Sequence, residues 1–384
     1  MRIIHWNILE YPSREANSVI NMKTCESFAD LGHEVTMLVP RSRERPRVSV
    51  AEIFSYYGVR PNFSIVQLPS PSFGGNACFY AFFGLISVLY IHWKRPRVVY
   101  SMFGPGSWLL GCTGRGSFFE AHGPPEANAV YYRKASAFFF SRWIRSPRAL
   151  GIVTNCRSLA DYLQRRFNYG TILPEHNAGD PPKAEATATP EHFALDTLHV
   201  GYIGQLCPGK GMEVIAAILE SCPWAHFHVV GGSESEVMYW RNAKIAPNIT
   251  FYGSIPFAAT EQYRQACDVL LLPFQTTVGT YAGGEYSSHF MSPTKLFEYM
   301  RAGKAIISAR SRSVEEVLRD GENALLCNGD APEEWIRALQ QLKDNPSLRA
   351  QLGAAAQGDL VQHHTWQQRA RRILDFFDQH SKAD

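Results

Sequence analysis

Residues 198–219 read Leu-His-Val-Gly-Tyr-Ile-Gly-Gln-Leu-Cys-Pro-Gly-Lys-Gly-Met-Glu-Val-Ile-Ala-Ala-Ile-Leu. The first six residues predict a short buried strand, and the run from Met212 onward has the apolar spacing of a helix. The turn between them is rich in glycine and holds Lys210 just before the helix. Glycine allows close approach to the backbone and a helix start attracts anions, so this unit predicts a phosphate site. Taken alone, Lys210 fits a surface lysine better, because the turn lacks Walker A or Gly-x-Gly-x-x-Gly spacing.

The same alternation of short apolar strands and helices runs along the whole chain. The strands that we predict are 3–6, 34–39, 64–68, 98–102, 118–122, 150–154, 198–203, 226–230, 250–252, 269–272, 305–308 and 324–326. Helices of the second half are predicted to begin near Met212, Glu234, Thr260, Pro293, Val314 and Pro332. This order indicates parallel sheets covered on both faces. We therefore expect an α/β chain of two doubly wound, Rossmann-like domains that face a central cleft, with ligands beyond the carboxyl ends of the strands.

Length and composition support two domains. A chain of 384 residues exceeds what one hydrophobic core usually holds, and 45% hydrophobic with 19% charged residues is typical of a folded protein. The stretch 181–196 is polar and without periodicity, which predicts a linker. We place the first domain at 1–185, the second at 186–360, and a C-terminal helix at 361–384 that packs back toward the first domain.

A second anion site is predicted at residues 292–303, which read Ser-Pro-Thr-Lys-Leu-Phe-Glu-Tyr-Met-Arg-Ala-Gly. We expect Ser292 to cap a helix and Pro293 to occupy its first position, which leaves free backbone amides beside the Lys295 ammonium group. One turn later, the carboxylate of Glu298 can accept two hydrogen bonds from a ribose diol. The alternative is an ordinary capped helix with an exposed glutamate.

In order and spacing, the segments of the second half resemble glycosyltransferase family 4, a family of retaining, two-domain enzymes with the GT-B fold. The matching segments are Tyr202-Ile-Gly-Gln-Leu, Lys210-Gly, His228-Val-Val-Gly-Gly, Ile249-Thr-Phe-Tyr-Gly, Cys267-Asp-Val-Leu-Leu-Leu-Pro, the stretch from Ser292 to Ile307, and Val314-Glu-Glu-Val-Leu-Arg-Asp-Gly-Glu-Asn-Ala-Leu. The first half matches more loosely, through Ala29-Asp-Leu-Gly-His-Glu-Val, Glu120-Ala-His-Gly and Glu175-His-Asn-Ala-Gly-Asp. The resemblance implies that the first domain binds the acceptor and the second binds a nucleotide-sugar donor.

The resemblance also implies roles for individual residues. It places His122 near the donor sugar, Lys210 against the diphosphate and Glu298 on the ribose, and these three are the candidate catalytic residues. The candidate donor-binding residues are Gln205, Gly209, Lys210, Gly231, Gly232, Ser292, Pro293, Thr294, Lys295, Leu296 and Glu298. Gln205 stands where the family often has a phosphate-binding arginine. His122 by itself also fits a buried histidine at a strand end.

The chemistry of transfer explains why these residue types are suitable. Breaking the bond to the sugar develops negative charge on the leaving diphosphate, so stabilising that group is a main task of the site. Lysines and backbone amides supply the countercharge, and the sequence has no Asp-x-Asp pair. We therefore expect a metal-independent transferase that uses a nucleotide-diphosphate sugar and no further cofactor, and the resemblance implies a retaining, front-face reaction.

One part of the family pattern is incomplete. The family carries two glutamates separated by seven residues; Glu298 matches the second, whereas Phe290 stands at the first. The preceding loop, 285–289, reads Glu-Tyr-Ser-Ser-His and offers replacement contacts for the sugar. The alternative is a surface loop without a role in binding.

The acceptor is expected to contact the loop after the first strand. This loop, 9–18, carries Arg14, Asn17 and Ser18 where relatives commonly have a pair of glycines. Asn17 or Ser18 could instead cap the following helix. The identity of the acceptor does not follow from these residues.

The net charge, the cysteines and the start of the chain bear on its partners and its location in the cell. The net charge is +3, and no basic tract accompanies a nucleic-acid reader motif, so we expect no nucleic-acid partner. The eight cysteines lack ligand spacing, which predicts reduced core residues and no metal site. Met1 leads straight into a strand pattern rather than a signal peptide, so a cytoplasmic location is expected.

Two segments raise the question of a membrane surface. Residues 77–93 are almost wholly apolar and precede Lys94, Arg95 and Arg97, but their length falls short of the roughly 20 residues that span a bilayer. Residues 133–148 mix aromatic residues with arginines, as interfacial helices do. We expect both segments to pack in the core, with peripheral inner-membrane association as the alternative.

Three functions compete at this point. The leading hypothesis is a retaining glycosyltransferase of polysaccharide or glycoconjugate biosynthesis. Phe290 and Gln205 suggest a second, a non-catalytic nucleotide-sugar-binding partner of an active transferase. The third is an epimerase of the same architecture, for which the sequence shows no obvious acidic pair. The oligomeric state, the donor nucleotide and the donor sugar do not follow from the sequence.

Overall fold

The computed structural model describes residues 1–381 except 14, 43–47, 70, 72–74, 128–132, 183–189, 191–192, 194–196, 244–245, 257–258 and 280–284. The chain divides into two compact units. Unit 1 consists of Met1–His176 and Trp366–Asp384, and unit 2 of Asn177–Thr365. The chain therefore leaves unit 1 nine residues before the boundary that we placed after residue 185, and most of the predicted linker lies outside the described residues.

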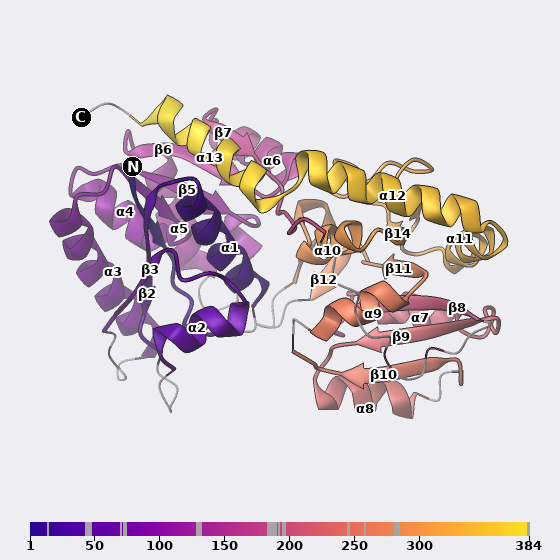
Figure 1. The fold of residues 1–384 in the computed structure, drawn as a ribbon. Coiled ribbons are helices and arrows are strands. Elements are labelled where there is room, and N and C mark those ends of the chain that lie inside the picture. The colour runs from indigo at the N-terminus through magenta and orange to yellow at the C-terminus, as the bar shows by residue number, and fades with distance from the viewer. Residues whose placement is uncertain are drawn as a thin grey trace. The chain divides into compact units, whose positions relative to one another are not determined.

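Unit 1 is built on a seven-stranded parallel sheet with the order β3-β2-β1-β4-β5-β6-β7 (Figure 1). Its strands are β1 (Arg2–Trp6), β2 (Glu34–Pro40), β3 (Ser64–Leu68), β4 (Val98–Ser101), β5 (Ser117–Ala121), β6 (Ala149–Thr154) and β7 (Ile172–Pro174). Its helices are α1 (Ala16–Asp30), α2 (Val50–Tyr57), α3 (Gly75–Lys94), α4 (Gly104–Cys112), α5 (Arg133–Ile144), α6 (Arg157–Phe167) and α13 (Trp366–His380), with a 3-10 turn, η1, at Pro125–Ala127.

Unit 2 repeats the plan with a six-stranded parallel sheet of order β10-β9-β8-β11-β14-β15. Its strands are β8 (Leu198–Ile203), β9 (Ala225–Val230), β10 (Ile249–Gly253), β11 (Val269–Leu272), β14 (Ala305–Ala309) and β15 (Leu325–Cys327). Its helices are α7 (Met212–Ile218), α8 (Glu234–Asn242), α9 (Thr260–Ala266), α10 (Thr294–Ala302), α11 (Pro332–Asp344) and α12 (Pro346–His363). A small antiparallel hairpin, β12 (Thr277–Gly279) and β13 (Glu285–Ser287), precedes the 3-10 turn η3 (Ser288–Phe290).

The central strands of unit 2 are apolar because both faces of the sheet are covered. Every residue of β8 and of β11 is buried. These two strands pair with each other although they are far apart in the sequence, because the chain first builds β9 and β10 on one side of β8 and then crosses to β11 on the other. Open α/β sheets bind ligands beyond the carboxyl ends of the strands at such a switch point.

The last helix completes the core of unit 1. α13, yellow in Figure 1, lies beside α1 and contacts β6. Its Phe377 is fully buried, with ring centroids 4.5 Å from Phe118, 5.0 Å from Tyr100 and 6.1 Å from Phe28. Unit 1 is therefore made from two separated stretches of sequence.

Three local expectations were wrong or incomplete. The helix expected near Val314 is a run of turns. The strand β7 and the hairpin β12–β13 are only three residues per strand and were not predicted. Helix α10 begins at Thr294 with Pro293 as its N-cap residue, so Ser292 does not cap it.

Candidate functional site

The predicted donor residues of unit 2 gather where β8, β9 and α10 meet. The turn after β8 is tied to the end of β9 because the Gly204 amide donates to the Val230 carbonyl oxygen at 2.8 Å. Helix α10 is fixed on β8 by Tyr299, whose hydroxyl accepts from the Ile203 amide at 2.8 Å. The glycine turns and the start of α10 are thus held at one end of the sheet.

Glycine is required for this close packing at three positions. A Cβ atom on Gly204 would overlap the Lys295 side chain. A Cβ atom on Gly231, which has a φ of +117°, would overlap the Gly204 carbonyl oxygen, and one on Gly232 would overlap Leu206. The two turns can approach each other, and Lys295 can lie against the backbone, only because these side chains are missing.

Two ammonium groups lie over one aromatic ring at this place. The Nζ atoms of Lys295 and Lys210 are 5.0 Å and 5.8 Å from the ring centroid of Phe274, which follows β11. Lys295 Nζ also lies 4.2 Å from the ring centroid of Tyr202 and donates to its hydroxyl at 3.2 Å. The Tyr202 hydroxyl is in turn 2.6 Å from the Gln205 carbonyl oxygen and 3.0 Å from that of Lys210. One buried tyrosine therefore connects both lysines and the glycine turn.

The electrostatics of the pair are those of a site prepared for an anion. Burial, reinforced by the nearby Lys210 charge, lowers the pKa of Lys295 to about 7, although the Glu298 carboxylate acts in the opposite direction. Burial also lowers the pKa of Lys210. A bound anion would oppose both shifts, because a nearby negative charge favours the protonated form of each lysine.

The start of α10 leaves its first amides without a side-chain cap. Its N-cap residue is Pro293, which offers no acceptor. The Ser292 hydroxyl oxygen instead accepts from the Asn177 amide at 2.9 Å. Helix starts of this kind bind anions, and the half-buried Thr294 and Lys295 lie in the first turn.

Glu298 lies one turn along the same helix and is held by a buried arginine. Arg264 Nη1 of α9 donates to Glu298 Oε2 at 3.1 Å, while its Nη2 donates to Glu261 Oε2 at 3.0 Å. Arg301 Nη1 adds a fourth charge 3.7 Å from Glu261 Oε2. The Glu298 carboxylate is thus fixed in position, as an acceptor for hydroxyl groups must be.

Two of the remaining predicted donor residues form hydrogen bonds through their backbone atoms, and a third lies in the core. Gln205 is half-buried and contributes its carbonyl oxygen to the Tyr202 hydroxyl. The Gly209 amide donates to Glu213 Oε1 at 3.0 Å, and its carbonyl oxygen accepts from the Gln275 amide at 3.0 Å. Leu296 is buried in the core beneath the site.

His122, the candidate catalytic residue of unit 1, directly follows β5. Its Nε2 donates to Glu120 Oε1 at 3.0 Å, and Arg369 Nη2 of α13 donates to the same oxygen at 2.6 Å. Burial alone would raise the pKa of the Glu120 carboxyl, but the Arg369 charge and the His122 hydrogen bond hold it well below its usual range. Because an ionised carboxylate only accepts, the hydrogen of His122 is fixed on Nε2.

The predicted acceptor residues lie at the start of α1. Arg14 is outside the described residues, and Asn17 is half-buried. The Ser18 hydroxyl donates to the Ser13 and Glu15 carbonyl oxygens at 3.0 Å and 2.6 Å. The N-cap residue is Glu15, so neither Asn17 nor Ser18 caps the helix.

Phe290 and the loop before it flank the start of α10. Phe290 ends the turn η3 and is half-buried. In the same loop, His289 Nδ1 lies 3.4 Å from the Arg312 amide, and the Ser288 carbonyl oxygen accepts from the Ser313 hydroxyl at 3.0 Å. The side chains of Glu285 and Tyr286 lie outside the described residues.

Four residues that shape these sites were not predicted. Tyr202 and Phe274 read as strand and turn residues, Arg264 as an ordinary helix arginine, and Glu120 as part of a family segment. Their roles depend on partners that are distant in the sequence, such as Lys295 for Tyr202 and Arg369 for Glu120. A polar group inside an otherwise apolar strand, as in Tyr202 and Glu120, is the signal that was available.

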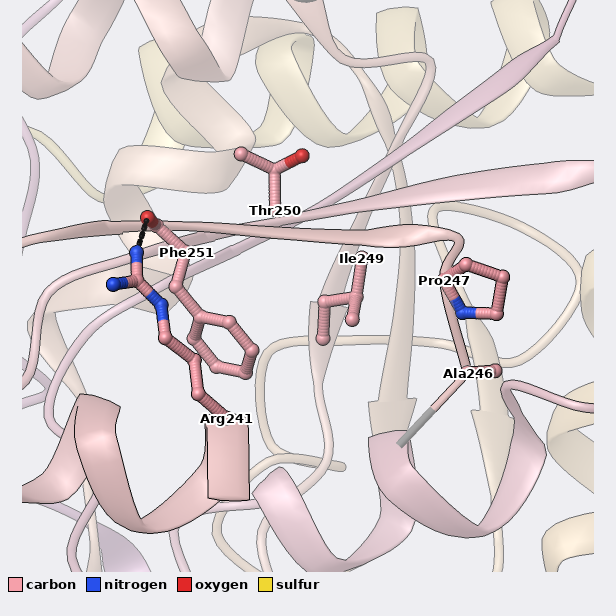
Figure 2. Close-up of a pocket in the computed structure, with 6 residues that line it drawn as sticks. All are labelled: Arg241, Ala246, Pro247, Ile249, Thr250 and Phe251. Carbon is pink, nitrogen blue, oxygen red and sulfur yellow. Dashed lines mark hydrogen bonds between the residues drawn. The ribbon is translucent and has the colours of Figure 1, made fainter. Parts of the chain in front are cut away.

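A depression of about 340 Å³ lies elsewhere on unit 2, at the edge strand β10 (Figure 2). Its walls are Arg241, Ala246, Pro247, Ile249, Thr250 and Phe251. The Arg241 side chain lies beside Phe251, and its Nη2 donates to the Phe251 carbonyl oxygen at 3.0 Å. It contains none of the predicted donor residues and involves the first half of the strand rather than its carboxyl end. In the part of the chain that the structure describes, no group of three or more His, Cys, Asp or Glu side chains is placed to hold a metal ion.

Comparison with known proteins agrees with the fold. Residues 213–375 match the model of a family described as glycosyl transferase-like. The chain is 26% identical over 207 residues to the D-inositol 3-phosphate glycosyltransferase of Corynebacterium diphtheriae, which covers 50% of this chain and 44% of that protein. The chain spans about half the length of the curated relatives that it matches.

Solved structures match over nearly the whole chain. HepE of Anabaena, in complex with UDP, superposes with a TM-score of 0.72 at 13% identity and covers 99% of this chain and 100% of its own. WaaG, a glycosyltransferase involved in lipopolysaccharide biosynthesis, gives 0.68 at 13% identity, with 97% and 98% covered. The predicted GT-B fold of two Rossmann-like, parallel-sheet domains is confirmed. The resemblance to glycosyltransferases is confirmed for residues 213–375, while membership in family 4 and retention stay predictions.

Proposed function

We propose that this protein is a glycosyltransferase that moves a sugar from a nucleotide-diphosphate donor to an acceptor with retention of the anomeric configuration. The observation that carries the proposal is the pair of half-buried lysines, Lys210 and Lys295, which lie over the Phe274 ring beside the start of α10, where no side chain caps the helix. Such a group of cations and amides suits a diphosphate, and it stands at the switch point of unit 2.

Each unit has a distinct task in the reaction. In unit 2, Lys210, Lys295 and the α10 amides stabilise the charge that develops on the leaving diphosphate, and Glu298 accepts hydrogen bonds from the ribose. In unit 1, His122 contacts the donor sugar, while Arg14 and Asn17 contact the acceptor. The Ser18 hydroxyl is already bonded within its own turn, which makes it the weakest of the three acceptor candidates.

The proposed reaction proceeds by front-face attack. The bond from the anomeric carbon to the diphosphate oxygen breaks, the acceptor oxygen forms its bond on the same face, and the departing phosphate takes the acceptor proton. Two ammonium groups and the helix amides provide the countercharge, so we propose that no metal is required. The names of the relatives support a role in glycoconjugate biosynthesis.

Two other functions are less well supported. Gln205 and Phe290 suggested a non-catalytic nucleotide-sugar-binding protein, but the relatives are named as glycosyltransferases, which favours an enzyme. An epimerase needs acid and base groups at the sugar, and the Glu298 carboxylate is held by Arg264.

Calorimetric titration with UDP, GDP and ADP, followed by each nucleotide's sugars, tests the proposal. We expect one nucleotide to bind, Lys210→Ala and Glu298→Ala to weaken it at least tenfold, and turnover to release that nucleotide in the presence of acceptor. The coupling constant of the product's anomeric proton by NMR reports retention. Binding without turnover over a wide acceptor panel would favour the non-catalytic function, and no nucleotide binding would overturn the proposal.

A further inference from the structure

Helix α3 of unit 1 presents an apolar stripe to solvent. Its members are Phe82, Leu85, Leu89 and Trp93, which are 42%, 53%, 63% and 71% exposed. Their spacing of three, four and four residues puts them on one side of the helix. The other side packs on the sheet through three buried residues, Phe83, Val88 and Ile91. We call the four exposed residues the α3 stripe.

The stripe is unusual for this molecule. Large hydrophobic residues that are exposed elsewhere in the described part of the chain occur singly or as neighbours, such as Met238 and Tyr239 of α8. The segment 133–148, the other candidate for membrane contact, exposes Phe138 but buries Phe140 and Trp143. Contiguous exposed apolar surface marks an interaction site, whereas scattered residues do not.

The charged residues of the segment at the carboxyl end of the stripe, Lys94, Arg95 and Arg97, are all positive. Lys94 Nζ lies 4.0 Å from the ring centroid of Trp93 and 5.8 Å from that of Tyr90. Arg95 is exposed, and α3 itself contains no aspartate or glutamate. Arg97, next along the chain, forms an exposed ion pair with Asp378 at 3.1 Å. A tryptophan, a tyrosine and a lysine grouped at one end of an apolar stripe suit the boundary between water and lipid.

A bilayer surface explains this arrangement better than a second copy of the chain. In a pair of α3 helices, Lys94 and Arg95 would meet no acidic residue from the opposite helix, because α3 has none. Anionic lipid headgroups supply that countercharge, and acyl chains accept the stripe. No helix in the described ranges is long and apolar enough to cross a membrane. One side of α3 is buried in the core of unit 1. The helix can therefore lie only on the surface of a bilayer.

We propose that α3 docks on the surface of an anionic bilayer, with the α3 stripe inserted among the upper acyl chains and Lys94 and Arg95 at the headgroups. This proposal is independent of the proposed catalytic function, since none of its residues belongs to the candidate site.

Vesicle co-flotation of the full chain tests the proposal. We expect binding to phosphatidylcholine vesicles that contain phosphatidylglycerol, and binding that weakens in high salt and on pure phosphatidylcholine. Lys94→Gln and Arg95→Gln should each weaken binding about fivefold, since a basic residue near an anionic surface contributes about that factor. Leu85→Gln with Leu89→Gln should abolish it, and the matched control, Met238→Gln with Tyr239→Gln, should leave it unchanged. Lys94 is half-buried and the other positions are exposed, so all variants should keep the wild-type melting temperature.

Fluorescence quenching by lipids measures whether the α3 stripe enters the bilayer. Brominated lipids should quench tryptophan fluorescence in the wild type and less in Trp93→Phe, whose fold and flotation should persist. Sedimentation velocity without lipid tests the alternative, which is a dimer of the chain through α3. A concentration-dependent dimer that Leu85→Gln with Leu89→Gln removes, together with absent flotation, would overturn the proposal in favour of a second copy. Absence of both, or equal flotation of the stripe and control variants, would also overturn it.

Discussion

At the scale of single residues, the titration of Lys295 is the property with the clearest consequence. Its pKa of about 7 lies below the usual value because the ammonium group is buried beside Lys210. A lowered lysine pKa means that the folded chain binds fewer protons than the unfolded chain between about pH 7 and 10. The contribution of this group to the free energy of unfolding therefore rises with pH over that interval.

Nucleotide affinity should show the opposite trend. A bound diphosphate favours the charged form of Lys295, so binding takes up a proton above pH 7 and the affinity for UDP falls by up to tenfold per pH unit between pH 7 and 9. Titration calorimetry in buffers of different ionisation enthalpy measures the proton uptake. Lys295→Arg, which stays charged, should bind with a flat pH profile. A wild-type profile equally flat would show that Lys295 does not face the diphosphate.

Two glycines of the same site should respond differently to alanine. At Gly204 the new methyl group meets the flexible end of Lys295, so the melting temperature should change little while nucleotide affinity falls about tenfold. At Gly231 it meets a backbone carbonyl at a φ of +117°, which should cost about 2 kcal/mol or more of stability. Denaturant unfolding and calorimetry of both variants check the contrast, which would be lost if Gly204→Ala were the less stable of the two.

At the scale of elements, burial and pattern made most of the sheet predictable. The bounds of β8 and β11 follow from runs of apolar residues between turn residues, because these strands are buried on both faces. The helix that we predicted near Val314 is absent, because a run of turns occupies this segment. The turns bury the apolar residues Val314, Val317 and Leu318 that suggested a helix. Strands of three residues, such as β7, are too short to show any periodicity.

Residues of the site were predictable only where a short motif in the sequence contains the signal. Lys210 and Lys295 each stand at a turn into a helix, a signal that one segment contains. Tyr202, Phe274 and Arg264 act through side chains tens of residues away, and a single sequence does not reveal which distant groups meet. The same limit hid the pairing of Glu120 with Arg369, which are 249 residues apart.

That pairing makes α13 the element whose loss should be most costly. Arg369→Met would leave Glu120 buried without its cation, which should lower the free energy of unfolding by about 3–5 kcal/mol. The control, Arg372→Met, removes a partly exposed partner of Glu175 and should cost about 1 kcal/mol. Because the Glu120 pKa is depressed, the wild-type contribution is present above about pH 5 and is lost as the pH falls.

Chemical denaturation at pH 7 and pH 4 measures these differences. Adding Glu120→Gln to Arg369→Met should recover part of the loss, since the uncompensated charge is then gone. Equal stability of the Arg369 and Arg372 variants would show that the buried pair contributes little.

At the scale of the whole molecule, the two cores are independent. The core of unit 2 is formed entirely between Leu198 and Leu360, whereas the core of unit 1 includes Ala370, Ile373, Leu374, Phe376 and Phe377 of α13. A fragment of residues 177–365 should therefore fold alone and bind the nucleotide with near wild-type affinity.

A chain ending at Thr365 should keep nucleotide binding but lose the cooperative unfolding of unit 1, because removing two buried phenylalanines alone should cost several kcal/mol. Circular dichroism and calorimetry of both fragments check this. Nucleotide binding that disappears in the 177–365 fragment would show that unit 1 contributes to the donor site.

The separation of unit 1 into two stretches also matters while the chain is being made. Residues 1–176 leave the ribosome first, yet the helix that covers Tyr100 and Phe118 follows them by about 190 residues. At 5–20 residues per second this is a delay of roughly 10–40 s, which spans the synthesis of the whole of unit 2. The apolar surface that α13 covers is thus exposed for the whole interval, and newly made chains should depend on chaperones for unit 1 until α13 follows unit 2 out of the ribosome.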